Sequence, residues 1–392
     1  MRVFSCFGRW AFAAIFFVGA GAAYAAPFTA GNVVIYRTGV GGVTTLVNTG
    51  SAVFLDEYTP AGTLVQSVPM PTTASGANKQ LIASGTATSE GLLTRSADGQ
   101  YLLATGYARD LGGAGSLAAT TSATVNRTVG RVDAAGNIDT STALTDWANA
   151  NNPRAATSSD GTAIWVAGGT GGVRYTTIGS TTSVDLTSTA ASGSFNNVRQ
   201  VNIFDNQLYA SSGSGTDTFR GVETIGTGLP TTGPQAVTRL PGMTDTNAGN
   251  MYAFVLADLT PTVVGVDTLY IADEGAPALS KFSLVGGTWT LNGTIGAGSD
   301  DYRGLTATIV GTTVNLFATR RGGSTGAGGG ELVSLVDATG YNGAFAGSPL
   351  LLATAATNTA FRGIALAPVP EPSSIALAGV GLVALLFARR RR

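Results

Sequence analysis

Two kinds of apolar segment alternate along most of this 392-residue chain, and their order constrains the fold more than any other feature. The first kind starts at a turn residue, and in four copies an arginine stands at its second position. Its six copies are 90–93, 153–156, 198–201, 251–254, 302–305 and 361–364. The second kind is an apolar strand pattern with an aromatic residue, as in 101–104, 164–167, 208–210, 269–272 and 316–318. Short apolar runs separated by turn residues predict an all-β protein.

The two ends of the chain supply the parts of one further repeat. Each pair of segments is followed by a hairpin-like pair, such as Lys281–Leu284 and Trp289–Leu291 around a Gly-Gly tip. Five four-strand units therefore run in sequence. Val33–Tyr36 begins a unit that lacks its first strand, and Phe361–Leu366 is the missing strand. A chain whose ends complete one repeat suits a closed ring, because closure removes the exposed strand edges.

We therefore predict that residues 26–368 form a six-bladed β-propeller closed by its N- and C-terminal strands. A β-helix and an irregular β-sandwich are the alternatives, since glycine-rich secreted chains form both. The repeats here are too long and too uneven for a β-helix. The first strands of the blades would then line a central channel.

The N-terminus has the features of a secretory signal peptide. Arg2 and Arg9 precede the apolar run Trp10–Ala22, and Ala23-Tyr24-Ala25 supplies small residues for signal peptidase. We predict cleavage after Ala25, so that residues 1–25 are removed. An uncleaved N-terminal anchor is the alternative, although the apolar run is too short to span a bilayer comfortably.

The C-terminus, residues 369–392, predicts a single transmembrane helix. Its apolar stretch Ile375–Ala388 would be roughly 21 Å long as a helix. That is short of a hydrocarbon core of about 30 Å, so Ser373 and Ser374 must be drawn in, the bilayer must thin, or the arginine side chains must snorkel to the interface. The terminal cluster Arg389, Arg390, Arg391 and Arg392 acts as a membrane stop and favours the cytoplasmic side, which leaves the rest of the chain outside. A C-terminal helix packed on the domain is the alternative.

This tail resembles the PEP-CTERM sorting signal of bacteria that carry an exosortase. The sorting motif is Val369, Pro370, Glu371 and Pro372, and the apolar helix and arginine cluster follow in the order that the family shows. The resemblance implies a transient anchor in the bacterial inner membrane and cleavage by exosortase near the motif. It also implies transfer to the cell surface or an extracellular matrix, often in biofilm settings rich in exopolysaccharide. It covers residues 369–392 only.

Two absences restrict the chemistry. The single cysteine, Cys6, lies in the predicted signal peptide, so the exported body has neither thiols nor disulfides and depends on its own core. The chain contains no histidine, which excludes Ser-His-Asp and Cys-His catalysis and His-ligated metals. We expect no cofactor and no metal.

The charge balance argues against nucleic acid as a partner. Two of the 22 basic residues lie in the signal peptide and four in the arginine cluster, which leaves 16 against 23 acidic residues, a net charge of about −7. Phosphate backbones require a cationic face on the protein.

The recurring arginines are the candidate ligand-binding residues. Arg154, Arg199, Arg303 and Arg362 stand near the start of first strands, where a propeller would gather them at one mouth of the channel. Guanidinium groups in such a partial ring suit an anionic ligand such as a uronic-acid glycan or phosphate. The alternative, which repeat architecture favours, is that each arginine joins neighbouring blades.

The acidic pairs 56–57, 273–274 and 300–301 are the other candidates, since oxygen clusters bind calcium and paired acids hydrolyse glycosides. None has the spacing of a calcium loop, and we interpret them as acids in solvated turns.

These observations favour an exported surface or matrix protein whose propeller binds a glycan or an envelope partner without catalysis. A secreted polysaccharide lyase or hydrolase is the alternative. No catalytic residue is assigned.

Overall fold

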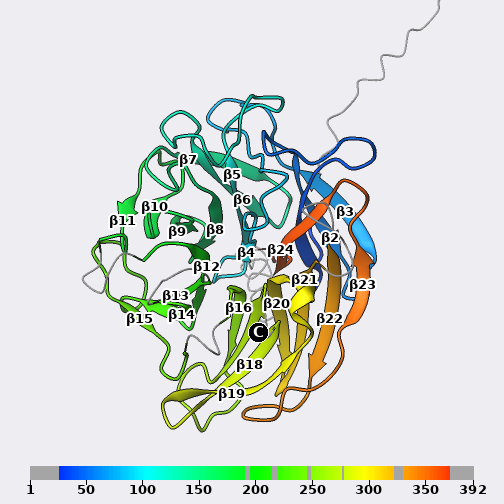
Figure 1. Cartoon of the computed structure of the whole chain (residues 1–392), viewed down its shortest axis with the longest axis vertical. Helices are drawn as coiled ribbons and strands as arrows, with labels where there is room; N and C mark the ends of the chain where they lie inside the picture. Colours follow the sequence, from blue (N-terminus) through cyan, green and yellow to red (C-terminus); the bar gives the residue numbers. More distant parts are fainter. Residues whose placement is uncertain are drawn as a thin grey trace, which may run out of the picture.

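The computed structural model of the protein describes residues 26–189, 195–213, 219–244, 249–275, 278–321 and 330–370. They form six four-stranded antiparallel sheets arranged as blades around a central axis (Figure 1). The predicted six-bladed β-propeller is therefore confirmed. The predicted signal peptide and transmembrane helix lie outside the described residues.

Each blade contains four strands that follow one another in the chain, except in the blade that joins the two ends. Blade 1 consists of β4 (Thr94–Arg95), β5 (Tyr101–Tyr107), β6 (Arg127–Asp133) and β7 (Ile138–Leu144). Blade 2 consists of β8 (Pro153–Ser158), β9 (Ala163–Gly168), β10 (Val173–Thr177) and β11 (Val184–Asp185). Blade 3 consists of β12 (Val198–Phe204), β13 (Gln207–Ser212), β14 (Gly221–Ile225) and β15 (Val237–Arg239).

The remaining blades follow the same pattern. Blade 4 consists of β16 (Met251–Ala257), β17 (Thr268–Asp273), β18 (Leu279–Val285) and β19 (Thr288–Ile295). A short 3-10 helix, η1 (Gly298–Asp300), precedes blade 5, which consists of β20 (Tyr302–Val310), β21 (Thr313–Arg320), β22 (Glu331–Asp337) and β23 (Leu350–Thr354). Blade 6 consists of β24 (Ala360–Leu366), β1 (Val33–Thr38), β2 (Val53–Tyr58) and β3 (Leu64–Pro69).

The two ends of the chain close the ring as the sequence predicts. Strand β24 pairs antiparallel with β1, and Ile35 lies opposite Ile364. Blade 6 then approaches blade 1 closely, because a Cβ atom on Gly363 would lie 2.1 Å from the backbone nitrogen of Leu93. Only glycine fits at that position without displacing the neighbouring backbone.

Two-residue turns set the register of several hairpins. Asp205 and Asn206 join β12 to β13 with φ values of 46° and 55°, and Gly286 and Gly287 join β18 to β19 with φ values of 58° and 81°. Two consecutive residues with positive φ form the tight turn whose twist matches that of antiparallel strands, and Asn and Gly tolerate this conformation best.

The predicted first strand of blade 1, residues 90–93, begins later in the structure than the sequence predicts. Strand β4 comprises only Thr94 and Arg95, and Gly91 has a φ of 79°. The segment bonds sideways to the neighbouring blades instead of to β5: the Leu92 N–H donates to the Arg154 carbonyl, and the Gly363 N–H donates to the Gly91 carbonyl. The segment reaches the channel as predicted, but its hydrogen bonds go to the neighbouring blades and not to β5.

A buried ion pair joins blades 4 and 5. Lys281 Nζ lies 2.8 Å from Asp337 Oδ2, and neither side chain is exposed. The Tyr270 hydroxyl donates to Asp337 at 2.6 Å, and Lys281 also donates to the Gly340 carbonyl. Burial alone would raise the pKa of Asp337, but hydrogen bonds led by the one from Lys281 hold it below its ordinary value.

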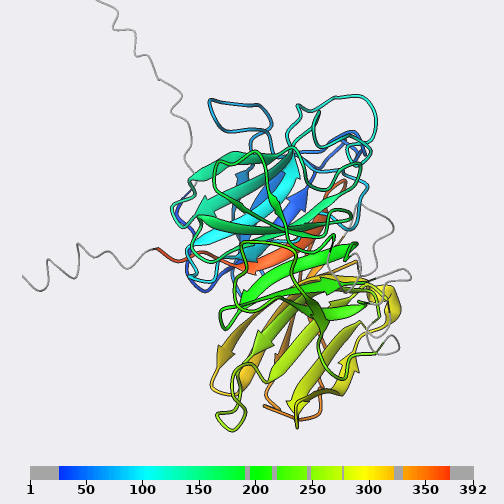
Figure 2. The same ribbon diagram turned by 90° about the vertical axis from the view of Figure 1, so that its left-hand side faces the viewer.

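Both ends of the described chain leave from the same side of the ring (Figure 2). The Phe28 N–H donates to the Ala134 carbonyl at 2.8 Å, and the Val369 N–H donates to the Gly99 carbonyl at 2.9 Å, so both ends contact blade 1. Among the described residues, no helix is long and apolar enough to cross a membrane.

Candidate ligand-binding site in the central channel

The first strands of the blades enclose a channel with two chemically different ends. We call the end near the starts of these strands the arginine end and define it by Arg154, Arg199, Arg303 and Arg362. We call the opposite end the cavity end. The chain leaves β24 at the cavity end, so the arginine end is the one turned away from the C-terminal tail.

Each arginine at the arginine end contacts a neighbouring blade. Arg154 Nη1 donates to Asn197 Oδ1 at 2.7 Å and to the Val198 carbonyl at 3.1 Å, which joins blade 2 to blade 3. Arg199 Nη2 donates to Asn250 Oδ1 at 3.3 Å, which joins blade 3 to blade 4. These are the contacts that the architectural interpretation predicts.

The other two arginines continue this arrangement around the ring. Arg303 donates to Glu274 Oε1 at 2.7 Å, and the Tyr252 hydroxyl donates to Glu274 Oε2 at 2.9 Å. Burial would raise the pKa of Glu274, but the Arg303 charge outweighs it and holds the pKa below its ordinary value. Arg362 Nη2 donates at 3.1 Å to the carbonyl of Gly85, which lies in the connection that leads from blade 6 to blade 1.

Glu90 is an acceptor at this end that sequence reasoning did not single out. Its carboxylate accepts the Ser84 N–H at 2.9 Å, the Tyr107 hydroxyl at 2.6 Å and the Asn152 amide at 2.5 Å. Complete burial nevertheless raises its pKa above the ordinary value, with these bonds and the charge of Arg362 opposing the rise.

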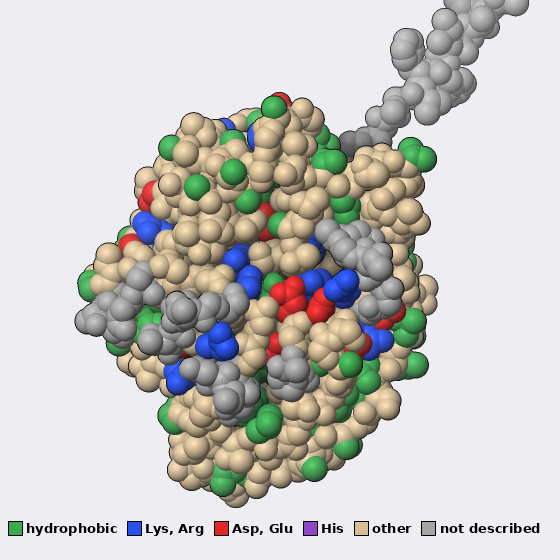
Figure 3. All heavy atoms as spheres, in the orientation of Figure 1, with side chains coloured by type: hydrophobic (Ala, Val, Ile, Leu, Met, Phe, Trp, Pro, Cys, Tyr) green, Lys and Arg blue, Asp and Glu red, His purple; other side chains and the backbone are tan. Residues whose placement is uncertain are grey.

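The four guanidinium groups of the arginine end interact with three carboxylates: Glu90 acts on Arg362, and Glu274 and Asp301 lie 2.7 Å and 3.9 Å from Arg303 Nη2. Burial lowers the pKa of Arg154 to about 9, with repulsion from Arg199 adding to it, and burial lowers that of Arg362 to about 10. Within the described part of the chain, Arg154 Nε and Arg362 Nη1 are buried and have no hydrogen-bond partner. Figure 3 shows basic and acidic side chains gathered in the middle of this face.

The acidic pairs are not the solvated turn residues that we expected. Asp56 is buried in β2 and forms an ion pair with Arg37 at 2.5 Å. Glu57 is also buried, and its Oε1 accepts the Thr29 N–H and the Asn32 amide. Donors from neighbouring strands compensate the burial of these carboxylates, which sequence alone does not reveal.

The other two acidic pairs differ from each other. Asp273 is buried at the end of β17 and accepts the Asn250 N–H at 2.9 Å, which also contradicts the expectation of a solvated turn. Asp300 and Asp301 are half-buried, and Asp301 forms an ion pair with Arg321 at 2.9 Å. Among the described residues, no group of three or more acidic side chains is arranged to hold a metal ion.

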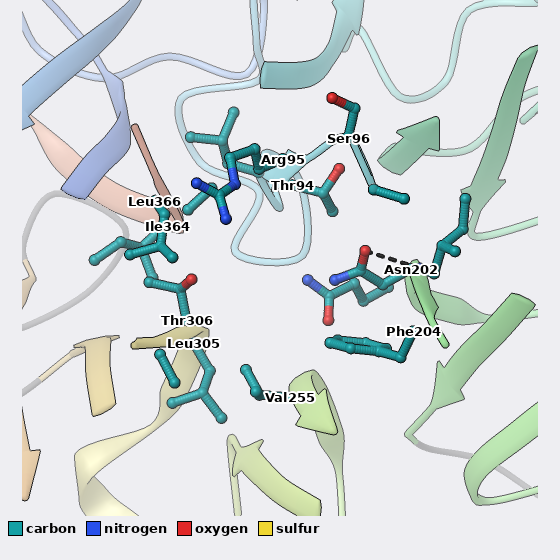
Figure 4. Close-up of a pocket in the computed structure, with 16 residues that line it drawn as sticks. Thr94, Arg95, Ser96, Asn202, Phe204, Val255, Leu305, Thr306, Ile364 and Leu366 are labelled. Carbon is teal, nitrogen blue, oxygen red and sulfur yellow. Dashed lines mark hydrogen bonds between the residues drawn. The ribbon is translucent and has the colours of Figure 1, made fainter. Parts of the chain in front are cut away.

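The cavity end contains side chains that sequence reasoning missed. A cavity of about 190 Å³ lies among β4, β12, β16, β20 and β24, and its polar lining includes Arg95, Gln200, Asn202 and Thr306. Figure 4 shows Arg95 and Asn202 on opposite sides of this cavity, with the ring of Phe204 below them. Gln200 and Asn202 are two residues apart on one strand and therefore share a face. A pair of amides two positions apart in a channel-lining strand is the signal that could have identified the site.

Only part of the sorting motif falls within the described residues. Val369 and Pro370 lie against blade 1, where they line a shallow cavity with Tyr101. Glu371 and Pro372 lie outside the described residues, as do Arg389, Arg390, Arg391 and Arg392.

The comparisons with known proteins agree with this division into body and tail. Residues 368–392 match the PEP-CTERM protein-sorting motif. The chain is thus a six-bladed β-propeller followed by a sorting signal of that type. The motif implies an exported protein that is anchored in the membrane and then processed by exosortase. No curated protein matches the sequence.

Several solved structures are similar to the propeller in fold. Hydrazine synthase of Kuenenia stuttgartiensis aligns with a TM-score of 0.38 at 12% identity, covering 67% of this chain and 65% of that one. The soluble aldose sugar dehydrogenase of Escherichia coli aligns with a TM-score of 0.43 at 12% identity, covering 74% and 93%. The WD40 domain of Toxoplasma gondii coronin aligns with a TM-score of 0.39 at 12% identity, covering 70% and 62%. The chain spans less than two thirds of the first and third of these, and the likenesses carry no argument about activity.

Proposed function

We propose that this protein is a non-catalytic binding module of the bacterial cell surface or extracellular matrix, delivered there by exosortase. Its N-terminal 25 residues direct export, and its C-terminal segment holds it in the inner membrane until cleavage. The propeller then binds an anionic glycan, such as exopolysaccharide, or an envelope partner.

The observation that supports binding is the presence at the arginine end of two buried guanidinium nitrogens, Arg154 Nε and Arg362 Nη1, that have no hydrogen-bond partner among the described residues. Four arginines converge there, and Glu90, Glu274 and Asp301 are carboxylates that act on them. Buried cations without full compensation are unfavourable, and an anion entering from solvent would relieve that cost. This end is turned away from the tail, so a membrane-held propeller presents it outward.

Glycan binding at the arginine end is tested with Arg199→Ala and Arg303→Ala variants of the exported body, residues 26–370. We expect at least tenfold weaker binding to an immobilised polyuronate, and no binding of the parent to a neutral glucan. Arg131→Ala, on the outer part of blade 1, serves as the control. Unchanged binding with a lower melting temperature would assign these arginines to architecture alone.

The sorting fate is tested with Glu371→Ala in the full-length chain. We expect the variant to accumulate in the membrane with its tail uncleaved, seen as a larger band on an immunoblot of the membrane fraction. Normal processing of the variant would contradict dependence on the motif.

The alternative function is a secreted polysaccharide lyase or hydrolase that uses acidic residues together with Tyr or Arg. Its test is incubation of the same body with envelope polysaccharides, followed by assays for reducing ends and unsaturated products. The binding-module proposal expects neither, and release of either product would overturn it.

A further inference from the structure

We propose that the cavity end of the channel is a second binding site, which takes a single carboxylated sugar ring. It is separate from the arginine end, uses different residues and lies on the side from which the C-terminal tail leaves. The argument rests on the fixed orientation of two amides, the charge of the lining, an aromatic face and the size of the space.

The two amides present donors to the cavity because their oxygens are already occupied. Gln200 Oε1 accepts the Phe254 N–H at 2.9 Å. Asn202 Oδ1 accepts the Ile203 N–H at 2.9 Å and the Thr157 hydroxyl at 3.3 Å. A backbone N–H can only donate, so these bonds decide which end of each amide is the oxygen.

The amide nitrogens are therefore the groups left for a ligand. In the described part of the chain, Gln200 Nε2 and Asn202 Nδ2 donate to no protein group and both are accessible to solvent, although Gln200 as a whole residue is 2% exposed. Two solvent-accessible donors that face one cavity are therefore free to donate to acceptor atoms of a ligand.

The positive charge of the residues that line the cavity favours an anionic ligand. Arg95 is the cation among the residues that line the cavity, and no acidic residue lines it. Arg95 Nη1 donates to the Ala367 carbonyl at 3.3 Å, and its other guanidinium nitrogens form no hydrogen bond within the described residues. Burial lowers the pKa of Arg95, although the charge of Asp98 opposes this. One guanidinium and two amides suit the two oxygens of one carboxylate together with neighbouring hydroxyls.

The remaining lining suits a ring rather than a bare carboxylate. Phe204 presents a flat aromatic face, and Val255 and Leu305 add apolar surface beside it (Figure 4). The cavity of about 190 Å³ has room for about six water molecules at about 30 Å³ each. That is enough for one six-membered ring and too little for the drug-sized ligands of larger pockets.

The carboxylated ring could be a free sugar acid or the terminal residue of a polymer, since both present the same groups. Half-buried Thr306, Ala307 and Leu366 place the cavity next to the surface, so either source can reach it. The experiment distinguishes them by the length of the probe.

The test is isothermal titration of the exported body, residues 26–370, with glucuronate, a glucuronate tetramer, glucose and acetate. We expect binding of glucuronate, with glucose and acetate at least tenfold weaker. Tighter binding of the tetramer assigns the site to a polymer end, whereas binding of the monomer alone assigns it to the free acid. No binding of either glucuronate probe would overturn the proposal.

The decisive variant is Asn202→Asp. It keeps the acceptor oxygen for the Ile203 N–H, replaces the donor nitrogen by an oxygen and adds a negative charge. We expect at least a tenfold loss of glucuronate binding with an unchanged circular dichroism spectrum. Asn342→Asp adds the same charge at an exposed loop after β22 and should leave binding within twofold.

The two proposed sites can fail separately. If Asn202→Asp binds glucuronate as tightly as the parent does, the cavity site is wrong, whatever happens at the arginine end. If Arg199→Ala and Arg303→Ala retain polyuronate binding while Asn202→Asp loses glucuronate binding, the arginine end is architectural and the cavity site stands.

Discussion

At the arginine end, Arg154 and Arg303 donate to acceptors of an adjacent blade at 3.1 Å and 2.7 Å, whereas Arg95 at the cavity end makes one longer bond, of 3.3 Å, to the Ala367 carbonyl just after β24 of blade 6. Both ends are built from the same six first strands. The difference shows that one repeat can join neighbouring blades through short, charged contacts at one end and through a single long hydrogen bond at the other, where amide nitrogens face a cavity. Sequence spacing alone does not separate these two uses.

The largest loss of stability is expected at the Lys281–Asp337 pair. This pair is fully buried between two blades, so the losses at the channel ends can be compared with it. Lys281→Met should lower the free energy of unfolding by about 4 kcal/mol, because it leaves the Asp337 carboxylate buried and unpaired. Urea unfolding followed by tryptophan fluorescence measures it. The double variant Lys281→Met/Asp337→Leu should recover part of the loss, and a double variant less stable than the single one would contradict this account.

A smaller loss is expected from Arg362→Met at the arginine end. The substitution leaves the Gly85 carbonyl without its donor and removes the cation that opposes the burial of Glu90, which together should cost about 3 kcal/mol. The same urea experiment applies. If Arg362→Met lost less stability than Arg95→Met, the conclusion that arginines contribute more to stability at the arginine end than at the cavity end would be wrong.

Arg303→Met should cost about 2 kcal/mol, because the Arg303 and Glu274 side chains are partly exposed and water replaces some of the interaction. At the cavity end, Arg95→Met should cost at most about 1 kcal/mol, since it removes one long hydrogen bond to a carbonyl. Melting temperatures and urea midpoints of the two variants, measured side by side, test this order. Equal losses would show that Arg95 holds blades 1 and 6 together as strongly as Arg303 holds blades 4 and 5.

The smallest effects concern pH, and the two acids of the arginine end should show opposite signs. The pKa of Glu274 is lowered by folding, so its stabilising contribution is complete above its unfolded value of about 4.3 and is lost as the pH falls below it. Glu274→Gln should therefore lose less stability than the parent between pH 5 and pH 3.

Folding raises the pKa of Glu90, so its charge opposes folding once the pH rises above about 4.3. Glu90→Gln should escape that penalty, and its stability should improve relative to the parent as the pH rises from 4 to 7. Urea midpoints across this range measure both variants. The same sign of pH dependence for the two variants would contradict the assignment of burial as the dominant cause at Glu90.

The ring of blades could be predicted because its signal is repeated. Six copies of the first-strand pattern, apolar second strands and glycine tips such as Gly286-Gly287 all agree, and the unmatched ends near Val33 and Phe361 indicate closure. The displaced strand at 90–93 shows the limit. A positive φ at Gly91 and bonds to two other blades depend on tertiary neighbours that a local pattern does not contain.

The candidate sites were less predictable for a related reason. The arginines recur and could be recognised, but their partners, Asn197, Asn250 and Glu274, come from other blades. Gln200 and Asn202 have no equivalents in the other repeats. Comparing the repeats with one another identifies the blades, but it does not single out these two residues. A buried acid such as Glu57 was mistaken for a surface residue, because its compensating donors are distant in sequence.

The pairing of β24 with β1 also fixes an order of events during biogenesis. Strand β1 has no partner on its inner side until the stretch ending at Leu366 has emerged, so the ring cannot seal while translocation is incomplete. Only a few residues lie between Leu366, the last residue of the closed ring, and the sorting motif that exosortase would recognise. Release from the bilayer would accordingly follow folding, and a chain from which β24 is deleted while the tail is kept would reach the surface with an open edge available for aggregation.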